Sequence, residues 1–455
     1  MSRRAWVALS LLAACARPRS QAPTPPVTRY AVAASDGGRT LTIDASLPAG
    51  TDGALVVDDG CAPFVRDVVI DGAPAELRDG AWRARCPDGC AVRYRYRLGE
   101  AARALDDVEL AAARGGALVA SPSAWLLRPQ PPSQGTFELS VRAPAGVSFG
   151  SGLRPTAVDR YTSTMAELPL APYSGFAPWR ARALPLDGGE IALSIVGDYA
   201  LSDDEIARWI GRAARMVSAY YGRFPTPRVW VGVLPTDGAE LFGRTLGNGG
   251  ASILLDWGRA TTLAQRDDDW IVPHELIHLA LPSLDARHRW LEEGLSTYVE
   301  PLVRRRAGIL TREALWRDLW RGLPSGLPAP GDRGLDETPT WGRTYWGGAL
   351  FCLVVDLELR ARSGGQTSLG DALRAIVAAG GDVSQRWELA RVLAVADRAT
   401  GLTVLGDTYA AWAHAPVDVD LPRVFAELGV TVRGERVTFD EAAPRAHLRR
   451  AIEAP

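Results

Sequence analysis

A short segment near the middle of the chain places two histidines four residues apart within an apolar run. It spans residues 271–279 and contains the pattern His274-Glu275-x-x-His278, and its apolar neighbours predict a buried helix over residues 269–282. Positions i and i+4 share one helical face, so both imidazoles point the same way. Unpartnered imidazoles are costly in a buried helix, which favours a shared metal ion over two hydrogen-bonded core histidines.

The spacing of this pattern suits zinc, with Glu275 beside the metal as a general base. A zinc site needs at least one further protein ligand, and two glutamates, Glu292 and Glu293, follow in a helix predicted over residues 289–306. Two histidines and one carboxylate leave a fourth position for water, which is the arrangement of catalytic zinc. The spacing alone does not choose between the two glutamates.

Several segments resemble one group of proteins. The segment Trp290-Leu291-Glu292-Glu293-Gly294-Leu295-Ser296-Thr297-Tyr298 resembles the Trp-x-x-Glu-Gly-x-x-x-Tyr motif of gluzincin metallopeptidases. The segment Tyr345-Trp346-Gly347-Gly348-Ala349-Leu350 resembles their Tyr-x-Lys-Gly-Ala-Leu motif. Residues 220–225 and 356–374 resemble segments of the glycyl aminopeptidase family, whose catalytic domain is related to that of the aminopeptidase N family. The resemblance covers about residues 200–380.

This resemblance implies a thermolysin-like, mainly helical zinc metallopeptidase domain that acts on peptides or proteins. It implies one Zn²⁺ per chain, bound by His274, His278 and Glu293, with Glu275 as the base. It also implies that Tyr345 stabilises the tetrahedral intermediate, the alternative being an ordinary interfacial tyrosine. The sequence departs from the family at Gly347, where the family has lysine.

A second departure concerns the glycine-rich strand that holds the substrate's amino terminus in the family. The corresponding segment here makes Gly249, Gly250 and Ala251 the expected substrate-binding positions, but it lacks the family's acidic residue. A buried ammonium needs a nearby carboxylate, so aminopeptidase specificity does not follow. Glu300 lies two helical turns after Glu293 and is expected to orient a ligating histidine, the alternative being an exposed acid at the helix end.

The overall fold class is predicted to be multidomain, with α and β parts. A length of 455 residues suggests two or three domains. Residues 28–198 read as short strands without an amphipathic helix, which predicts an all-β, sandwich-like N-terminal domain. Residues 199–416 begin with a helix capped by Ser202, continue with two strands, at 229–234 and 251–256, and then become mainly helical, which predicts the catalytic domain. Residues 417–455 are expected to form a short tail packed on it. The further helices are predicted at 312–321, 343–363, 368–379, 385–398 and 404–414.

The N-terminus has the parts of an export signal. Arg3 and Arg4 precede an apolar stretch over residues 5–14, and Leu12-Ala13-Ala14-Cys15 resembles a bacterial lipobox whose cysteine is acylated. Residues 16–27 form a proline-rich tether. An ordinary signal peptide with an incidental cysteine is the alternative, and the arginine pair also resembles a twin-arginine signal. We expect a protein exported and anchored by lipid in the bacterial cell envelope, at the outer membrane, that touches the membrane only through this anchor.

Cysteines and charge set further limits. Exported proteins meet oxidising conditions, and one disulfide is expected among Cys61, Cys86 and Cys90. The 51 basic and 53 acidic residues give a net charge of −2, which argues against nucleic acid as a partner. The chain contains no lysine, which excludes Schiff-base chemistry and a Walker-type phosphate loop. Nothing in the sequence indicates an oligomeric state.

Three functional hypotheses follow from these patterns. The first is a zinc-dependent peptidase. The second is a catalytically silent binding or scaffold lipoprotein that keeps zinc for structure, with four protein ligands and no open position. The third is hydrolysis of a non-peptide amide or ester by the same residues.

Overall fold

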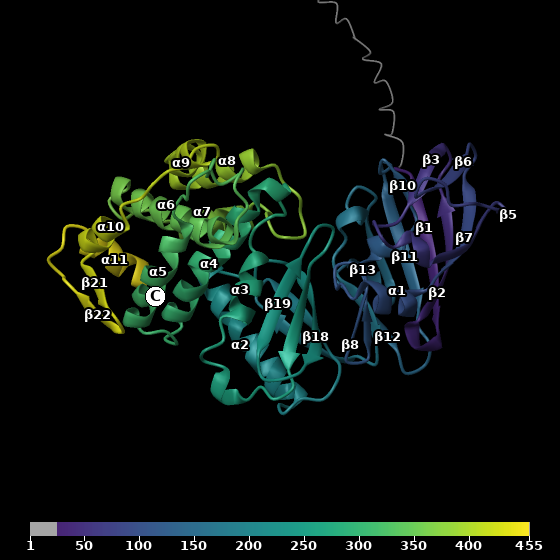
Figure 1. Cartoon of the computed structure of the whole chain (residues 1–455), viewed down its shortest axis with the longest axis horizontal. Coiled ribbons are helices and arrows are strands. Elements are labelled where there is room, and N and C mark those ends of the chain that lie inside the picture. The colour runs from purple at the N-terminus through teal and green to yellow at the C-terminus, as the bar shows by residue number, and fades with distance from the viewer. Residues whose placement is uncertain (1–24, 455) are drawn as a thin grey trace, which may run out of the picture.

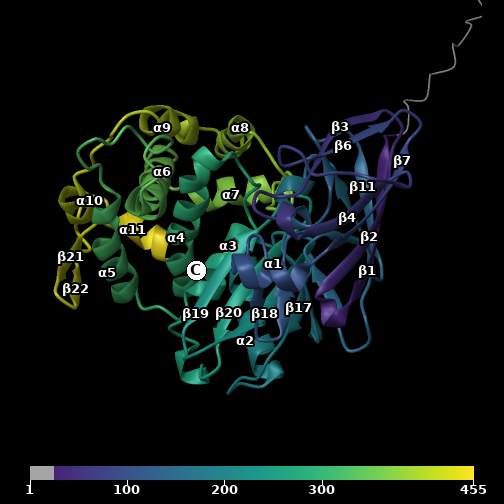
Figure 2. The ribbon, with the colours of Figure 1, turned by 45° about the vertical axis from the view of Figure 1, so that its right-hand side comes forward.

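Strands dominate the N-terminal part of the chain and helices the C-terminal part, as the sequence predicted (Figure 1). The computed structural model describes residues 25–454, so the predicted signal segment and Cys15 lie outside the described residues. A five-stranded sheet contains β18 (Arg228–Thr236) and β19 (Leu241–Leu246), which lie between the β-rich part and the helices (Figures 1 and 2). No helix in the described part of the chain combines the length and hydropathy needed to cross a membrane.

The N-terminal part is built on an eight-stranded sheet with the order β13-β14-β11-β1-β2-β7-β4-β5. Side chains of β7 alternate between buried and exposed, so one face of the sheet covers an apolar core. The strands are β1 (Val27–Ser35), β2 (Thr40–Leu47), β4 (Val65–Ile70), β5 (Ala73–Pro74), β7 (Cys90–Tyr96), β11 (Thr136–Arg142), β13 (Arg154–Ala157) and β14 (Arg160–Thr164).

Two smaller sheets and one helix complete this part. The first small sheet contains β3 (Thr51–Val56), β6 (Trp82–Cys86) and β10 (Arg128–Gln130), and the second contains β8 (Ala112–Arg114), β9 (Ala117–Val119), β12 (Ser148–Ser151) and β15 (Ser174–Ala177). The helix α1 (Leu98–Leu105) corrects the expectation that this region has none. Eight residues are too few to show a clear helical period in the sequence, although one face of α1 is buried.

The five-stranded sheet has the order β16-β17-β18-β20-β19. Its strands are β16 (Arg180–Leu186), β17 (Gly189–Ile195), β18 (Arg228–Thr236), β19 (Leu241–Leu246) and β20 (Ser252–Gly258). The predicted domain boundary at residue 198 divides this sheet, because β17 precedes it and pairs in parallel with β18 after it. A strand's sequence does not show which sheet it joins, so this grouping is decided by tertiary contacts. The edge strand β19 was not predicted.

The helix α2 (Asp203–Tyr221) begins with the expected Ser202 cap, in which Ser202 and Glu205 form a reciprocal capping box. It packs against the helix α3 (Ile271–His278), which is shorter than the predicted 269–282. Asp269 sets the start of α3, since its Oδ1 accepts hydrogen bonds from the backbone of Ile271 and Val272 at 2.9 and 3.3 Å.

The remaining helices are α4 (Arg289–Arg306), α5 (Arg312–Gly322), α6 (Gly348–Arg362), α7 (Leu369–Ala378), α8 (Leu389–Thr400), α9 (Val404–Trp412), α10 (Leu421–Glu427) and α11 (Ala446–Glu453), with a hairpin of β21 (Val430–Arg433) and β22 (Arg436–Phe439). The helices up to α9 follow the predicted order, and α10, α11 and the hairpin lie in the segment that was expected to be only a short tail. A π-helical turn, Arg343–Gly347, precedes α6, where a single helix over 343–363 was predicted. Leu421, Phe425 and Ile452 belong to the same apolar core as α3 and α4, so the residues after 416 are part of the helical unit.

Candidate functional site

The helix α3 presents two imidazoles on one face. The Nε2 atoms of His274 and His278 lie 3.3 Å apart, and the ring centroids 4.9 Å. His274 is buried and His278 is partly buried, in a helix whose other side packs into the core through Val272, Leu276 and Ile277. Helical periodicity therefore separates the side of α3 that stabilises the fold from the side that carries the histidines.

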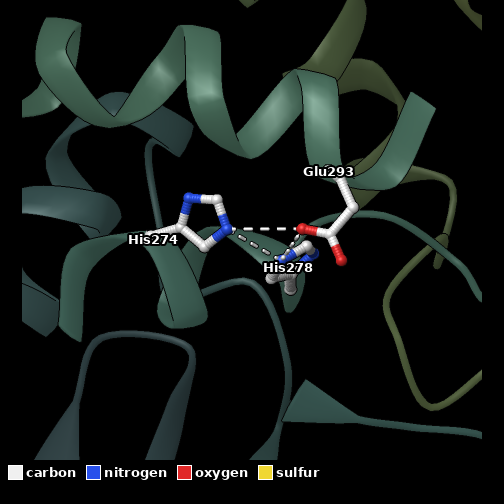
Figure 3. A group of neighbouring side chains, drawn as sticks. All are labelled: His274, His278 and Glu293. Carbon is white, nitrogen blue, oxygen red and sulfur yellow. Dashed lines mark hydrogen bonds and ion pairs between the residues drawn. The ribbon is translucent and has the colours of Figure 1, made fainter. Parts of the chain in front are cut away.

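The third member of the cluster is Glu293, on the neighbouring helix α4. Its Oε2 lies 3.5 Å from Nε2 of His274 and 3.4 Å from Nε2 of His278 (Figure 3). Glu292 points elsewhere: its Oε1 accepts a hydrogen bond from the backbone of Leu284 at 2.9 Å. The structure thus separates the two glutamates that spacing alone left equivalent.

These distances fit a zinc ion. Zinc bonds of about 2.0–2.1 Å at tetrahedral angles place ligand atoms about 3.3–3.4 Å apart. The three separations, 3.3, 3.4 and 3.5 Å, match three edges of such a tetrahedron. Within residues 25–454, His274, His278 and Glu293 are the group of neighbouring side chains that suits a metal. Three ligands leave one corner of the tetrahedron for another molecule.

The electrostatics of the cluster also favour a cation. Burial disfavours the charged forms of both partners, yet the Glu293 carboxylate raises the pKa of His278 to about 9. In turn, the charge of His278 and hydrogen bonds from both histidines hold the pKa of Glu293 well below its usual range. The other carboxylate oxygen, Oε1, lies 3.5 Å from the guanidinium of Arg289. The ligands therefore form a pocket that stabilises positive charge, which a divalent metal supplies in place of a proton.

The edge strand β19 holds Glu275, the glutamate between the histidines. Thr245 Oγ1 donates a hydrogen bond to Glu275 Oε2 at 2.7 Å. On the same face of β19, Gly243 lets Glu275 approach, since a Cβ there would lie 2.4 Å from Glu275 Cγ. Neither Thr245 nor Gly243 was singled out from the sequence. Leu241, Gly243 and Thr245 lie on one face of β19, and such a spacing of two residues is the sequence signal for a strand. The signal is weak here, because Gly243 has no side chain and a glycine-rich turn follows.

The predicted substrate-binding positions Gly249, Gly250 and Ala251 lie in the turn between β19 and β20, not in the edge strand. Gly250 forms an isolated β-bridge with Leu153. The backbone N–H of Ala251 donates a hydrogen bond to Gly152 O at 3.0 Å, so the turn contacts the N-terminal part. This corrects the expected placement: the strand beside the metal cluster is β19. The glycines are needed for this close approach, because a Cβ on Gly250 would lie 2.1 Å from Gly152 O.

Tyr345 lies in the π-helical turn and is half-buried. Burial, followed by the charge of Glu293, raises its pKa, while Arg289 opposes the change. The phenol therefore keeps its proton and remains a hydrogen-bond donor. Arg343 anchors this turn through an ion pair with Asp332 at 2.8 Å between two almost fully buried side chains.

Glu300 does not take the role predicted for it. Its carboxylate accepts a hydrogen bond from Arg304 at 3.2 Å, and both side chains are buried. Arg304 in turn donates to Asp267 O at 2.8 Å. Burial raises the pKa of Glu300 to about 8, against the attraction of Arg304. The alternative of an exposed helix-end acid is wrong as well, because α4 continues through Pro301.

The structure shows how the cysteines of the described part of the chain are paired. A disulfide joins Cys86 and Cys90, while Cys61 is a buried free thiol. Cys352 is a buried free thiol in α6.

Comparison with known proteins gives structural matches only. No family profile and no curated protein matches the sequence. An aminopeptidase N family protein from Idiomarina loihiensis matches with a TM-score of 0.67 and 14% identity, over 89% of this chain and 79% of that one. A glutamate-to-alanine mutant of an M1 zinc metallopeptidase from Deinococcus radiodurans, bound to a Tyr-Ser-Ala substrate, matches with a TM-score of 0.54 and 16% identity, over 88% of this chain and 96% of that one.

A third solved structure, yeast LTA4 hydrolase, matches with a TM-score of 0.52 and 14% identity, over 89% of this chain and 70% of that one. At such identities the likeness concerns the fold, not the activity. The fold likeness extends over the β-rich and helical parts together, beyond the catalytic segment on which the sequence resemblance rested. The chain therefore has the fold of the M1, aminopeptidase N family zinc metallopeptidases.

Proposed function

We propose that this protein is a zinc-dependent peptidase, with zinc bound by His274, His278 and Glu293. The observation that carries the proposal is the arrangement of three metal-compatible side chains with Glu275 on the turn between the two histidines. The structurally similar Deinococcus enzyme binds a tripeptide, which supports a peptide substrate. The scaffold alternative requires a fourth protein ligand, and the group within residues 25–454 contains three.

When bound, a zinc ion supplies Lewis acidity, which makes water a nucleophile near neutral pH. Glu275, held by Thr245, accepts the proton of the attacking water and passes it to the leaving amine. The Tyr345 phenol donates a hydrogen bond to the oxygen of the scissile carbonyl as negative charge develops there. Arg289 keeps the Glu293 carboxylate oriented from the side opposite the histidines.

The test combines metal analysis with a fluorogenic peptide library. Glu275→Gln is expected to retain one zinc per chain and to lose hydrolysis by a factor of about 10²–10⁴. Glu293→Gln is expected to lose zinc, whereas Glu292→Gln, a change at the neighbouring glutamate, is expected to retain it. Zinc binding without hydrolysis of any peptide would argue against the proposal, and ester substrates assayed in parallel test the alternative chemistry.

We also propose that the chain is exported and anchored by lipid through Cys15 in the cell envelope. The support is the order of basic residues, apolar stretch and lipobox-like segment. In a bacterial host, the wild type is expected in the membrane fraction and Cys15→Ser in the soluble fraction. Equal partition of the two proteins contradicts the proposal.

A further inference from the structure

Two tryptophans that contact residues of the proposed site, His274 and Tyr345, are exposed to solvent. Trp270 is 51% exposed and Trp341 is 66% exposed, whereas Trp125, Trp230, Trp257 and Trp316 are fully buried. An exposed indole leaves a large apolar area in water, at a cost that a polar residue at the same position does not have. Single exposed apolar residues are common on protein surfaces, so the position of these two decides their meaning.

Each of the two tryptophans lies four residues before a residue of the site. Trp270 precedes His274, and their rings meet edge to face with centroids 5.6 Å apart. Because 270, 274 and 278 share one face of the helix, Trp270 extends the metal-binding face of α3 by one turn. Trp341 precedes Tyr345, and their rings are tilted by 32° with centroids 6.0 Å apart.

The other side chains assigned to the site are polar. Glu275, Glu293 and Arg289 carry charge, and Thr245 and Tyr345 carry hydroxyls, so these residues suit the peptide backbone and the developing charge of the reaction. The exposed indoles are the apolar surface in direct contact with His274 and Tyr345. An apolar surface continuous with a catalytic centre binds the substrate groups closest to the reacting bond.

We propose that Trp270 and Trp341 determine specificity by binding large apolar side chains of a peptide substrate close to the scissile bond. This inference rests on the proposed peptidase function and names its substrate class. Burial of the exposed indole surface by leucine or phenylalanine side chains supplies binding energy that glycine and serine lack.

The experiment compares two matched peptide series in which the residues flanking the scissile bond are either leucine and phenylalanine or glycine and serine. Trp341→Ala and Trp270→Ala are each expected to lower kcat/KM for the leucine and phenylalanine series at least about tenfold, with a much smaller change for the glycine and serine series. Trp341→Phe and Trp270→Phe are expected to keep the preference. Val158→Ala, at an exposed apolar residue in the N-terminal part, is the matched control and is expected to change neither series.

Zinc content is measured for every variant, so that loss of metal is separated from loss of selectivity. Equal loss for both series overturns the inference, because it shows that the indoles only support His274 and Tyr345. Unchanged selectivity together with lost binding to phospholipid vesicles also overturns it and assigns the indoles to a membrane surface.

If the wild-type protein hydrolyses no peptide, the proposed function fails, and binding then decides the inference. Calorimetry on zinc-loaded protein with the two series is expected to show tighter binding of the leucine and phenylalanine peptides, lost in Trp341→Ala. Equal affinities for the two series overturn it.

Discussion

Thr245 on the edge strand β19 donates a hydrogen bond of 2.7 Å to the carboxylate of Glu275 on α3. The sheet therefore orients the proposed general base through a single hydroxyl. Gly243, two residues earlier on the same strand, leaves the space that this contact requires. The edge strand thus borders the metal cluster and also fixes the position of the Glu275 carboxylate.

Thr245→Val removes this hydrogen bond with little change in shape. We expect kcat to fall about tenfold or more, because the carboxylate loses its orientation, within the 10²–10⁴ contribution of a general base. Zinc content is expected to stay at one per chain, and Thr245→Ser is expected to restore most of the activity. Unchanged kcat in Thr245→Val contradicts the role of this contact.

The helices α4 and α6 cross closely at Gly294 and Gly348. Gly294 directly follows Glu293 on α4, and Gly348 directly follows the π-helical turn that contains Tyr345. A Cβ on Gly294 would lie 2.2 Å from the Cα of Gly348. Gly294→Ala is expected to lower the free energy of unfolding by about 1–3 kcal/mol and to reduce kcat, because the two helices must separate. Urea unfolding measures the first effect.

The matched control for this substitution is Gly211→Ala on α2, where the nearest neighbour of an added Cβ is the end of the Arg215 side chain at 3.4 Å. We expect it to raise stability by about 0.5–1 kcal/mol, since alanine is the better helix former. Destabilisation at both positions would show that an added methyl group is harmful in these helices in general, so that the close crossing is not the specific cause.

Glu300 makes stability depend on pH. Its pKa is raised from 4.5 to about 8, so the folded protein keeps a proton that the unfolded chain releases. Its contribution is therefore fully present below pH 4.5 and is lost as the pH rises through 8. Glu300→Gln imitates the protonated form and is expected to gain stability relative to wild type between pH 5.5 and 8.5, by up to a few kcal/mol. The free energy of unfolding of both proteins is measured by urea unfolding at pH 5.5 and at pH 8.5. A difference between the variant and the wild type that is the same at both pH values contradicts this interpretation.

Metal removal is expected to lower thermal stability, because the ligands from α3 and α4 converge only in the folded chain. Free zinc at a thousand times its Kd stabilises a protein by about 4 kcal/mol. A chelator is expected to lower the Tm of the wild type by several degrees, and added zinc to restore it. The Tm of Glu293→Gln is expected to respond little to either treatment, and a full response there would place the metal elsewhere.

Local patterns in the sequence predicted much of the helical part. The helix predicted over 289–306 has the bounds of α4, and the Ser202 cap starts α2 as expected. The edge strand β19 was missed because Gly243, with no side chain, and the glycine-rich segment that follows the strand weaken the pattern that marks it. The placement of Gly249–Ala251 in the edge strand was wrong for the same reason, since the edge strand β19 lies before these residues.

The sequence by itself determined that two imidazoles share a helical face, because that depends only on the 3.6-residue period within eight neighbouring residues. It also determined the division between a β-rich and a helical part, which follows from the period of apolar residues along each segment. The spacing left Glu292 and Glu293 equivalent and only the resemblance favoured Glu293, whereas the tertiary structure places Glu293 against the histidines and Thr245 against Glu275. These relationships depend on the rotation and distance between packed elements, which no local pattern of residues specifies.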